Sequence, residues 1–546
     1  MSSTVPTASG HLSFTGKRWI LPDISRKSEE DILVALAASR GIAPSDAIPR
    51  LVPPQVFHDM PKAVERIRRA IASGERIAVF GDYDCDGITA AAQLVRFFRR
   101  NGTEPLVRLP DRVQDGYGLS MAIVEEMRNA HVTLLITCDT GITASNEIAA
   151  LADLGIETIV TDHHRVSEEL PPAYALLHPA LCGHPVPHPS GAGVVFKLLS
   201  GLENGHWEDM QTDLALAMLG TVADLVELKG DNRTIVTAGL RALDALRSGP
   251  LAVLRDRCRS TDKPLSSTDV AFRIAPRINA AGRMQSPVIA LHALLEGGEH
   301  LATLDALNTE RQEQTAQFLE HITGDIGTVP PPFIVRADAQ YPHGLLGLLS
   351  GKLTETYGRP SMVATITGET CTASLRSPAC YNVTEALGRC AHLLMRFGGH
   401  AQAAGCTFRS SNLNALESAL LEDVEQRIAR EMLVPSLTLD AEIQTTDISP
   451  DFVRRISVLE PFGQGNPEPK FLLRNVSITA PRTVGSDGTH LQGVMDGVSC
   501  IGFNLGSLAE KCQNIDVVAR IGMNTWNGSI RPQIVMEDMR LTIRDL

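Results

Sequence analysis

Residues 79–90 read VFGDYDCDGITA, an apolar run followed at once by three closely spaced aspartates, Asp82, Asp84 and Asp86. A single aspartate after a strand is usually a turn residue or a helix cap, because its side chain accepts a hydrogen bond from a nearby backbone N–H. Three carboxylates in five residues exceed that need, and their charges repel one another unless a cation lies among them. The stretch therefore indicates a metal site at the end of a strand.

The run RIAVF at 76–80 begins a series of β-rich runs that alternate with helical stretches. The runs EPLVRL, VTLLIT and IETIV repeat the strand pattern, and ITAAAQLVRFFRR has helical composition. Such alternation predicts a mostly parallel sheet covered by helices. Ligands of these sheets gather at the carboxyl ends of the strands, which is where the aspartates stand.

Two further strand ends carry similar side chains. Asp139 follows the run TLLITC, the triplet Asp162, His163 and His164 follows ETIV, and Asp224 lies in a later helical stretch. Carboxylates with a minority of histidines suit Mn²⁺ or Mg²⁺ better than Zn²⁺, and the histidines favour Mn²⁺. Caps and ion pairs are the alternative explanation of these residues.

Carboxylates in this number can bridge two ions about 3.5–4 Å apart, which stabilise the attacking and leaving oxygens of a phosphoryl displacement. The pattern therefore predicts hydrolysis of a phosphate ester or anhydride. The first strand is not followed by GxGxxG, and the chain contains neither GxxxxGK[ST] nor GxSxG. Nucleotide-cofactor, P-loop and serine-hydrolase chemistry thus lack support.

Length and composition limit the remaining classes. A chain of 546 residues is too long for one hydrophobic core, so we expect three or four domains. Ten scattered cysteines without a CxxC motif are typical of reduced thiols in a cytosolic protein. No apolar run reaches eighteen residues and no secretory signal is visible, so we expect a cytoplasmic protein without membrane contact. The net charge of −13 leaves room only for a local basic track.

Such a track is suggested by AFRIAPRINAAGR at 271–283, where Arg273, Arg277 and Arg283 occur with no acid between them. A solvated helix face or ion pairs with acidic neighbours is the alternative. Because proline and glycine interrupt the segment, we expect a loop that holds phosphate groups.

A second set lies further along the chain, in ASLRS at 373–377 and FGGHAQAAG at 397–405. Gly399 and its neighbour expose backbone N–H groups, and Ser374, Arg376 and His400 can bind a phosphate or a sugar. Each segment alone could be a tight turn with a buried histidine. Together they suggest a second jaw that faces the metal site.

The ordered motifs GDYDCDG, CDTGI, TDHHR, GTVADLV and GGHAQAAG resemble those of the DHH phosphoesterases. Further stretches are similar to the RecJ-type 5′→3′ exonucleases of that family, which are specific for single-stranded DNA. These stretches are DRVQDGYGLS, APRINAAGR, LNTERQ, HGLLGLLSGKL and LEPFGQGNPEP. The resemblance runs from about residue 18 to the last residues of the chain.

The resemblance implies roles for individual residues. Two divalent ions, Mn²⁺ or Mg²⁺, would be bound by Asp82, Asp84, Asp139, His163 and Asp224, and these residues with His164 would form the catalytic set. Arg112, Ser374 and Arg376 would hold the 5′-terminal phosphate or nearby backbone. Arg283 would contact the strand, and Gly399 and His400 would belong to the second jaw.

We therefore expect a multidomain α/β protein with a DHH parallel-sheet domain, a helical connector, a second α/β domain of the DHHA1 type and a C-terminal OB-type β-barrel. The expected ranges are an N-terminal extension at 1–55, the DHH catalytic domain at 56–260, the connector at 261–330, the DHHA1-type clamping domain at 331–433 and the OB-fold-like nucleic-acid-binding domain at 434–546.

The expected function is metal-dependent hydrolysis of single-stranded DNA from its 5′ end, in DNA repair and recombination. Two alternatives stay open: a DHH phosphodiesterase that acts on short oligonucleotides or cyclic dinucleotides, and a non-catalytic DNA-binding relative. The resemblance also implies a single-strand-binding protein and a helicase as partners, and the multidomain clamp suggests a monomer.

Overall fold

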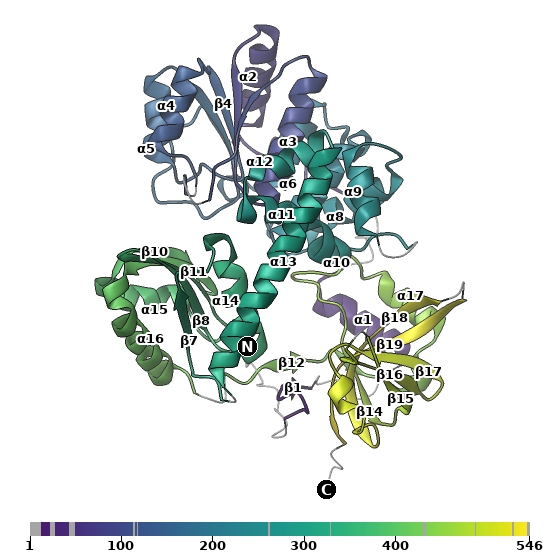
Figure 1. Ribbon diagram of the computed structural model, residues 1–546. Coiled ribbons are helices and arrows are strands. Elements are labelled where there is room, and N and C mark those ends of the chain that lie inside the picture. Colours follow the sequence, from purple (N-terminus) through teal and green to yellow (C-terminus); the bar gives the residue numbers. More distant parts are fainter. Residues whose placement is uncertain are drawn as a thin grey trace.

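The computed structural model describes residues 12–21, 28–42, 50–112, 115–116, 118–259, 263–327, 329–429, 433–485, 487–526 and 529–542. Figure 1 shows an α/β domain and a helical region above, a second α/β domain below them, and a β-rich C-terminal domain to one side. The expected fold class is confirmed, because each predicted part is present in the predicted order.

The first domain is built on a five-stranded, fully parallel sheet with the strand order β3-β2-β4-β5-β6. Its central strands are apolar and buried throughout, as expected for a sheet covered on both faces. The strands are β2 (Ile77–Gly81), β3 (Leu106–Arg108), β4 (Leu134–Cys138), β5 (Glu157–Thr161) and β6 (Ala175–Leu177).

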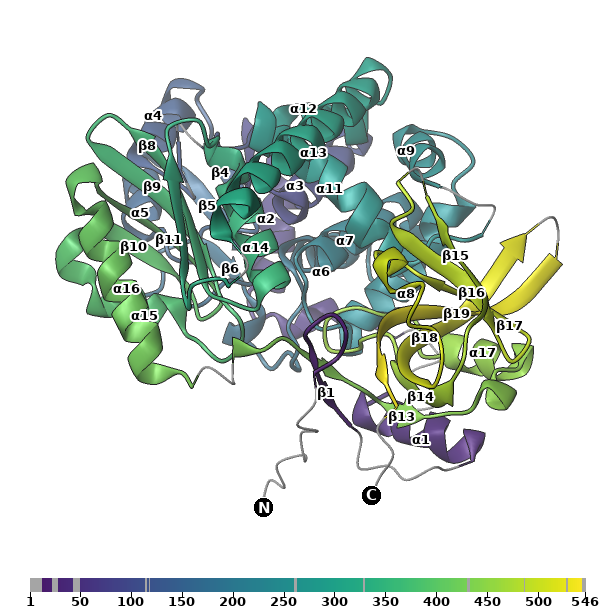
Figure 2. The same ribbon diagram turned by 60° about the horizontal axis from the view of Figure 1, so that its bottom comes forward.

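Helices cover both faces of this sheet. One face carries α4 (Met121–Asn129) and α5 (Ser145–Asp153), whose apolar side chains form a small core of their own. The other face packs against a much larger helical layer (Figure 2). The helices of this layer are α2 (Met60–Ala72), α3 (Cys85–Arg100), α6 (Gly191–Leu202), α7 (Gln211–Ala223), α8 (Gly230–Ala245) and α9 (Pro250–Cys258).

The connector consists of α10 (Ser267–Asp269), a π-helical segment (Val270–Ile274), α11 (Ala275–Met284), α12 (Pro287–Leu295) and α13 (Glu299–Ile326). Its first helices share the core of the first domain. The 28 residues of α13 span about 42 Å, and Ile322 and Ile326 at its far end pack with the second domain. One helix therefore reaches from one domain to the other (Figure 1).

The expected phosphate-holding loop at 271–283 is wrong, since the segment is helical. Pro276 stands in the first turn of α11, where no backbone N–H is required. Gly282 lies inside the helix because α11 passes close to another segment there: a Cβ at this position would lie 2.7 Å from the carbonyl oxygen of Tyr83. The two residues expected to form a loop thus mark a helix start and a close contact.

The second domain has a five-stranded mixed sheet with the order β10-β11-β9-β8-β7. Only β7 and β8 are parallel. The strands are β7 (Ile334–Asp338), β8 (Ser361–Thr367), β9 (Thr370–Arg376), β10 (Leu394–His400) and β11 (Ala403–Arg409), and the helices are α14 (Leu346–Tyr357), α15 (Val383–Arg389) and α16 (Leu413–Arg427).

The C-terminal domain has a seven-stranded sheet with the order β13-β14-β18-β19-β17-β16-β15, in which only the β13–β14 and β17–β19 pairs are parallel. Apolar residues of this sheet and of α17 (Pro450–Ser457) form its core. The strands are β13 (Ala441–Glu442), β14 (Phe471–Val476), β15 (Thr479–Val484), β16 (His490–Met495), β17 (Val498–Gly502), β18 (Ile515–Trp526) and β19 (Ser529–Leu541).

The N-terminal segment packs on this C-terminal domain. Its strand β1 (Arg18–Ile20) pairs in parallel with β12 (Ser436–Thr438), and Ile32 and Leu36 of α1 (Glu29–Ser39) enter the C-terminal core. Trp19 is fully buried, and its indole N–H donates to Asp538 Oδ2 over 2.8 Å. Among the helices in the described part of the chain, none has the length and apolar character needed to cross a bilayer.

Candidate active site

The site begins where β2 ends. Asp82 follows the strand directly and is buried, and its Oδ1 accepts a hydrogen bond from the backbone N–H of Tyr83 over 2.7 Å. Asp84 is the N-cap of α3, because its Oδ1 accepts from the N–H groups of Asp86 and Gly87 over 3.0 and 3.2 Å. Of the three aspartates, Asp84 is therefore the one that caps a helix, and it does so with Oδ1 alone.

Asp86 has a different role from its two neighbours. Its carboxylate accepts hydrogen bonds from the N–H groups of Gly191 (2.7 Å) and Ala192 (3.0 Å), in the first turn of α6. Gly220 of α7 leaves room for it, since a Cβ there would lie 2.3 Å from Asp86 Oδ1. The third aspartate of the opening motif therefore joins α3, α6 and α7 beneath the site.

Asp139 follows β4 with a left-handed backbone (φ +63°), which is uncommon for a residue other than glycine. Its carboxylate lies against Gly191, where a Cβ would come within 2.4 Å of Asp139 Oδ1. This oxygen is buried and has no hydrogen-bond donor among the described residues. Strain and an unsatisfied acceptor together are typical of a functional position.

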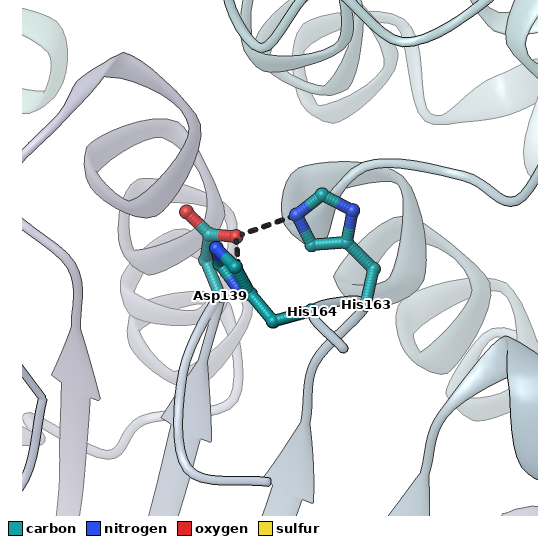
Figure 3. A group of neighbouring side chains, drawn as sticks. All are labelled: Asp139, His163 and His164. Atoms are coloured by element: carbon teal, nitrogen blue, oxygen red, sulfur yellow. Dashed lines mark ion pairs between the residues drawn. The ribbon is translucent and has the colours of Figure 1, made fainter. Parts of the chain in front are cut away.

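The two histidines of the triplet approach Asp139 from the end of β5 (Figure 3). His163 Nε2 lies 3.1 Å from Asp139 Oδ1, and His164 Nδ1 lies 3.9 Å from the same oxygen. Asp224, which ends α7, places Oδ2 3.6 Å from His163 Nε2, and Asp86 Oδ2 lies 3.9 Å from that nitrogen. In the described part of the chain His163 Nε2 is buried without a hydrogen-bond partner, so it is available as a metal ligand.

Asp162 and His178 position the histidines without joining the cluster. Asp162 Oδ1 accepts from the backbone N–H groups of His163 and His164 and lies 2.8 Å from His164 Nδ1. Nδ1 of His178 accepts from the N–H of Ala180, so its Nε2 carries the proton and donates to the carbonyl of His164 over 2.8 Å. These contacts fix the direction of the triplet, and the spacing of the sequence does not reveal them.

Burial and mutual repulsion act on the acids together. Burial, followed by the charges of neighbouring carboxylates, raises the pKa of the carboxyls of Asp82, Asp86, Asp139 and Asp224 above their usual range. Burial and the neighbouring His164 lower the pKa of His163 to about 3. For His164, burial alone would lower the pKa, but the hydrogen bond with Asp162 and the charges of Asp162, Asp224 and Asp82 together raise it to about 9. Among these groups only His164 offers a counter-charge at neutral pH.

The donor atoms fit divalent ions. Three groups each bring their ligand atoms within 4.8 Å of one another: Asp82 with Asp84 and Asp139, Asp86 with His163 and Asp224, and Asp139 with His163 and His164. The set is rich in oxygen and contains no thiolate, as Mn²⁺ and Mg²⁺ prefer. We call the predicted residues Asp82, Asp84, Asp139, His163, His164 and Asp224 the acid–histidine cluster.

A group of arginines lies next to this cluster. Burial and the charges of Arg112, Arg311 and Arg376 lower the pKa of Arg283 to about 9. The Arg112 guanidinium lies 4.3 Å from the ring centre of Tyr83. Tyr83 is the residue between Asp82 and Asp84 in the sequence. The Nε atoms of Arg112 and Arg311 are buried without an acceptor among the described residues. We call these four residues the arginine cluster.

The first turn of α14 covers part of the arginine cluster. A Cβ at Gly347 would lie 3.0 Å from a terminal nitrogen of Arg376 and 3.4 Å from Ser374 Oγ, so Ser374 and Arg376 lie side by side beneath it. At Gly344 a Cβ would meet the Arg283 carbonyl at 2.0 Å. The close approach at Gly344 brings the second domain onto α11 of the connector, whereas the contacts of Gly347 lie within the second domain.

Other predicted residues are not members of the arginine cluster, although burial and the nearby charge of Arg277 lower the pKa of Arg311. Arg277 is an ion-pair partner of Asp305, with its Nε 2.9 Å from the carboxylate, as the alternative interpretation of this segment expects. Gly399 and His400 are exposed on the outer strand β10, and Gly399 has φ +142°. His400 is not the buried histidine of a tight turn.

Sequence reasoning did not single out Arg311, although it stands in the motif LNTERQ, because one arginine on a long helix looks like a solvated residue. It also missed a groove of about 310 Å³ between the first and C-terminal domains. Phe272, on the π-helical segment, is 77% exposed there, and Leu225, which directly follows Asp224, is 67% exposed. π-Helical turns are frequent at functional sites.

Comparison with known proteins gives three family-model matches. Residues 76–221 match the DHH family N-terminal domain, residues 331–430 match the DHHA1 domain, and residues 439–538 match the RecJ OB domain. Curated relatives include the single-stranded-DNA-specific exonucleases RecJ of Bacillus subtilis (33% identical) and Thermus thermophilus (34%). The matched region is 88% of this chain in both comparisons, and 63% and 70% of the respective relatives.

Solved structures give the same result. The crystal structure of RecJ from Thermus thermophilus in complex with Mn²⁺ has a TM-score of 0.85 and 29% identity, and covers 97% of this chain and 80% of that one. The Mg²⁺ complex of RecJ from the same organism has a TM-score of 0.78 at 28% identity, covering 97% of this chain and 79% of that one.

Proposed function

Because the chain belongs to the RecJ family of DHH phosphoesterases, we propose that it is a metal-dependent exonuclease that hydrolyses single-stranded DNA from the 5′ end. The observation that carries this proposal is that the acid–histidine cluster and the arginine cluster lie next to each other. Arg112 stacks on Tyr83 between Asp82 and Asp84, so a site for cations adjoins a site for anions. A terminal phosphate with its neighbouring phosphodiester has the charge pattern to fill both.

We assign the divalent ions to Asp82, Asp84, Asp139, His163 and Asp224. Bound there, Mn²⁺ or Mg²⁺ would supply an activated water and neutralise charge on the phosphate. Support comes from the unsatisfied atoms of Asp139 and His163 and from the crystal structures of the Thermus RecJ with Mn²⁺ or Mg²⁺. Asp162 and His178 hold the two histidines of the triplet in place. Asp86 fixes the helices beneath them.

Polarity follows from the arginine cluster. A 5′-terminal phosphate bound by Arg112, Ser374 and Arg376 would place the adjoining phosphodiester toward the acids, so cleavage would begin at that end. Arg283 would contact the strand, and Arg311 adds a positive charge that sequence reasoning did not identify. Guanidinium groups suit phosphates because they donate two parallel hydrogen bonds.

The strand would leave the site toward the C-terminal domain. The groove that contains Leu225 and Phe272 begins beside Asp224 and ends at the C-terminal domain, with Phe462, Gln464 and Arg520 on its far wall. Exposed aromatic side chains stack on bases without regard to sequence, as an enzyme that degrades any strand requires. Gly399 and His400 of the second jaw would contact the strand from the opposite side.

We further propose the five-part division with boundaries near residues 55, 260, 330 and 433, and a monomer that acts in the cytoplasm in repair and recombination. A single-strand-binding protein and a helicase would supply its substrate. Residues of the described segments 12–21 and 28–42 pack on the C-terminal domain, which supports treating these parts as one nucleic-acid-binding unit.

The test is a time course with Mn²⁺ on a long single strand labelled at its 3′ end. A duplex, a dinucleotide and the Asp139→Asn variant serve as controls. Progressive shortening from the 5′ end, absent in the variant, is the expected result. Cleavage of the dinucleotide alone would favour the short-oligonucleotide phosphodiesterase, and binding without cleavage would favour the non-catalytic relative.

A further inference from the structure

A second group of metal-ligating side chains lies at the turn between α12 and α13. His292 stands in the last turn of α12, Glu296 caps that helix, and His300 lies in the first turn of α13. Gly297 (φ +72°) and Gly298 (φ +59°) reverse the chain between them, in a conformation that favours glycine. This reversal of the chain brings the side chains of His292 and His300, eight positions apart, close together.

The geometry of the three side chains suits one ion. Their ligand atoms all lie within 4.8 Å of one another, His300 Nε2 is 3.6 Å from Glu296 Oε2, and the two imidazole rings are 5.2 Å apart. Ligand atoms around a tetrahedral Zn²⁺ lie about 3.3 Å apart, given bond lengths of about 2.0–2.2 Å. Glu296 and His300 are 45% and 41% exposed, so side-chain rotation can close the remaining gap.

The local charges permit a cation at this turn. Arg99 is the neighbouring cation that forms an ion pair here, with its guanidinium 3.9 Å from Glu296 Oε1. Arg99 also binds both carboxylate oxygens of Glu104, over 2.8 to 3.1 Å, so most of its charge is balanced elsewhere. Glu296 can therefore turn toward the histidines.

This group is separate from the acid–histidine cluster. Arg99 lies in the last turn of α3, whereas Asp84 caps the first turn of the same helix. Fifteen residues of α-helix separate the two ends by about 22 Å. The ligand chemistry differs as well, because two imidazoles and one carboxylate suit Zn²⁺, whereas the active site is dominated by oxygen.

We propose that His292, Glu296 and His300 form a site for zinc or a similar borderline transition ion, which fastens the N-terminal end of α13 to α12. The site has three protein ligands, and a water completes the tetrahedron. Since α13 runs from the first domain, which carries the acid–histidine cluster, to the second domain, which carries Arg376 of the arginine cluster, the ion would hold this helix at its end in the first domain. The alternative is a helix-surface ion pair between Glu296 and His300 without a metal.

The experiment counts zinc bound per chain by equilibrium dialysis and elemental analysis on the full-length protein. The Asp139→Asn chain should retain zinc at the turn, and adding His292→Ala and His300→Ala to it should remove one equivalent. His321→Ala, at an exposed histidine further along α13, is the matched control and should change nothing. Equal zinc content with and without the two histidines would overturn the proposal.

Two further measurements guard against a folding artefact. Glu296→Gln keeps the size of the side chain and should weaken zinc binding at least about tenfold while leaving the circular dichroism unchanged. Co²⁺ added to the Asp139→Asn chain should give the visible spectrum of a four-coordinate ion, and this spectrum should be lost in the variant without both histidines. A Co²⁺ spectrum that survives their removal would place the ion elsewhere and refute the site.

Discussion

The acid–histidine cluster and the arginine cluster lie next to each other, yet they differ from an ordinary buried group of three polar side chains in the same domain. In that group, Asp231 accepts hydrogen bonds from His184 and from Lys197, so the opposite charges compensate each other within the chain. The two functional clusters instead collect like charges, and each has buried atoms without a partner among the described residues. Buried charges that are paired within the chain contribute to stability, whereas buried charges without such a partner can bind an ion or a charged substrate.

The largest effect is expected when the acid–histidine cluster loses one ligand. Asp139→Asn keeps the shape and tolerates the left-handed backbone, but it removes a charge on which the ions depend. We expect kcat with Mn²⁺ to fall roughly 10³-fold, equivalent to about 4 kcal/mol. The metal-free variant should be at least as stable as the parent, because a repelling buried carboxylate is gone. A lower Tm of the metal-free variant would contradict this explanation.

Asp86→Asn is the matched comparison, because Asp86 is already compensated by two backbone N–H groups. An amide offers one acceptor in place of two, so one N–H of α6 loses its partner. We expect a loss of about 1–3 kcal/mol in the free energy of unfolding, measured in urea. An unchanged stability together with a kcat as low as that of Asp139→Asn would place Asp86 among the metal ligands instead.

Removal of metal should lower the thermal stability of the parent protein, because the buried carboxylates then lack their counter-charge. An ion that binds only the folded chain stabilises it by about 2.7 kcal/mol at 100 times its Kd. We expect Mn²⁺ to raise the Tm of the parent and EDTA to reverse the rise. The shift should be much smaller in Asp139→Asn, and an equal shift in both would show that the ion binds at another place.

The arginine cluster can be tested by its preference for a terminal phosphate. Arg376→Met should reduce the preference for 5′-phosphorylated over 5′-hydroxyl strands by about 10-fold or more, since a charge-assisted hydrogen bond contributes about 1.5–3 kcal/mol. Arg277→Met is the control, because Arg277 is already paired with Asp305. The ratio of kcat/KM on the two strands is the measurement. An equal loss of preference in both variants would refute the distinction between open and compensated arginines.

Phe272→Ala should have a smaller effect, confined to long substrates. Loss of one stacked base costs about 1 kcal/mol or more, so KM on a long single strand should rise at least about fivefold with kcat little changed. Met121→Ala, at an exposed apolar residue on α4, is the control. If turnover of a dinucleotide suffers as much as that of the long strand, the groove is not the path of the strand.

The stability contributed by Asp231 with His184 and Lys197 should depend on pH and not on Mn²⁺. Burial alone would raise the pKa of Asp231, but the hydrogen bonds with His184, Lys197 and the Val52 N–H and the charge of Lys197 together lower it below its usual value. The stability that this ionised group contributes is present above about pH 4 and is lost as the pH falls below it. Urea denaturation at pH 5 and pH 3 should therefore show a larger drop for the parent than for Asp231→Asn. Mn²⁺ should not alter that difference.

The sequence predicted the parallel sheet, the order of the domains and the residues that meet at the strand ends, because strand periodicity and the end of each apolar run are local properties. It could not show that backbone N–H groups of α6 hold the Asp86 carboxylate, since these groups belong to residues about a hundred positions later. A helical connector was expected over 261–330, but its segment 271–283 was wrongly predicted to be a loop, for a similar reason. Gly282 is required by a close contact with the Tyr83 carbonyl, and the two residues come together only in the folded chain.

The attachment of the N-terminal segment to the C-terminal domain sets an order of events during synthesis. Trp19 is made early, but its partner Asp538 lies 519 residues further along the chain. At about 5–20 residues per second, a ribosome needs roughly 25 to 100 s to cover that distance. Throughout that time Trp19, Ile32 and Leu36 lack the surface that will bury them. These apolar side chains therefore stay accessible to chaperones until β19 has been synthesised.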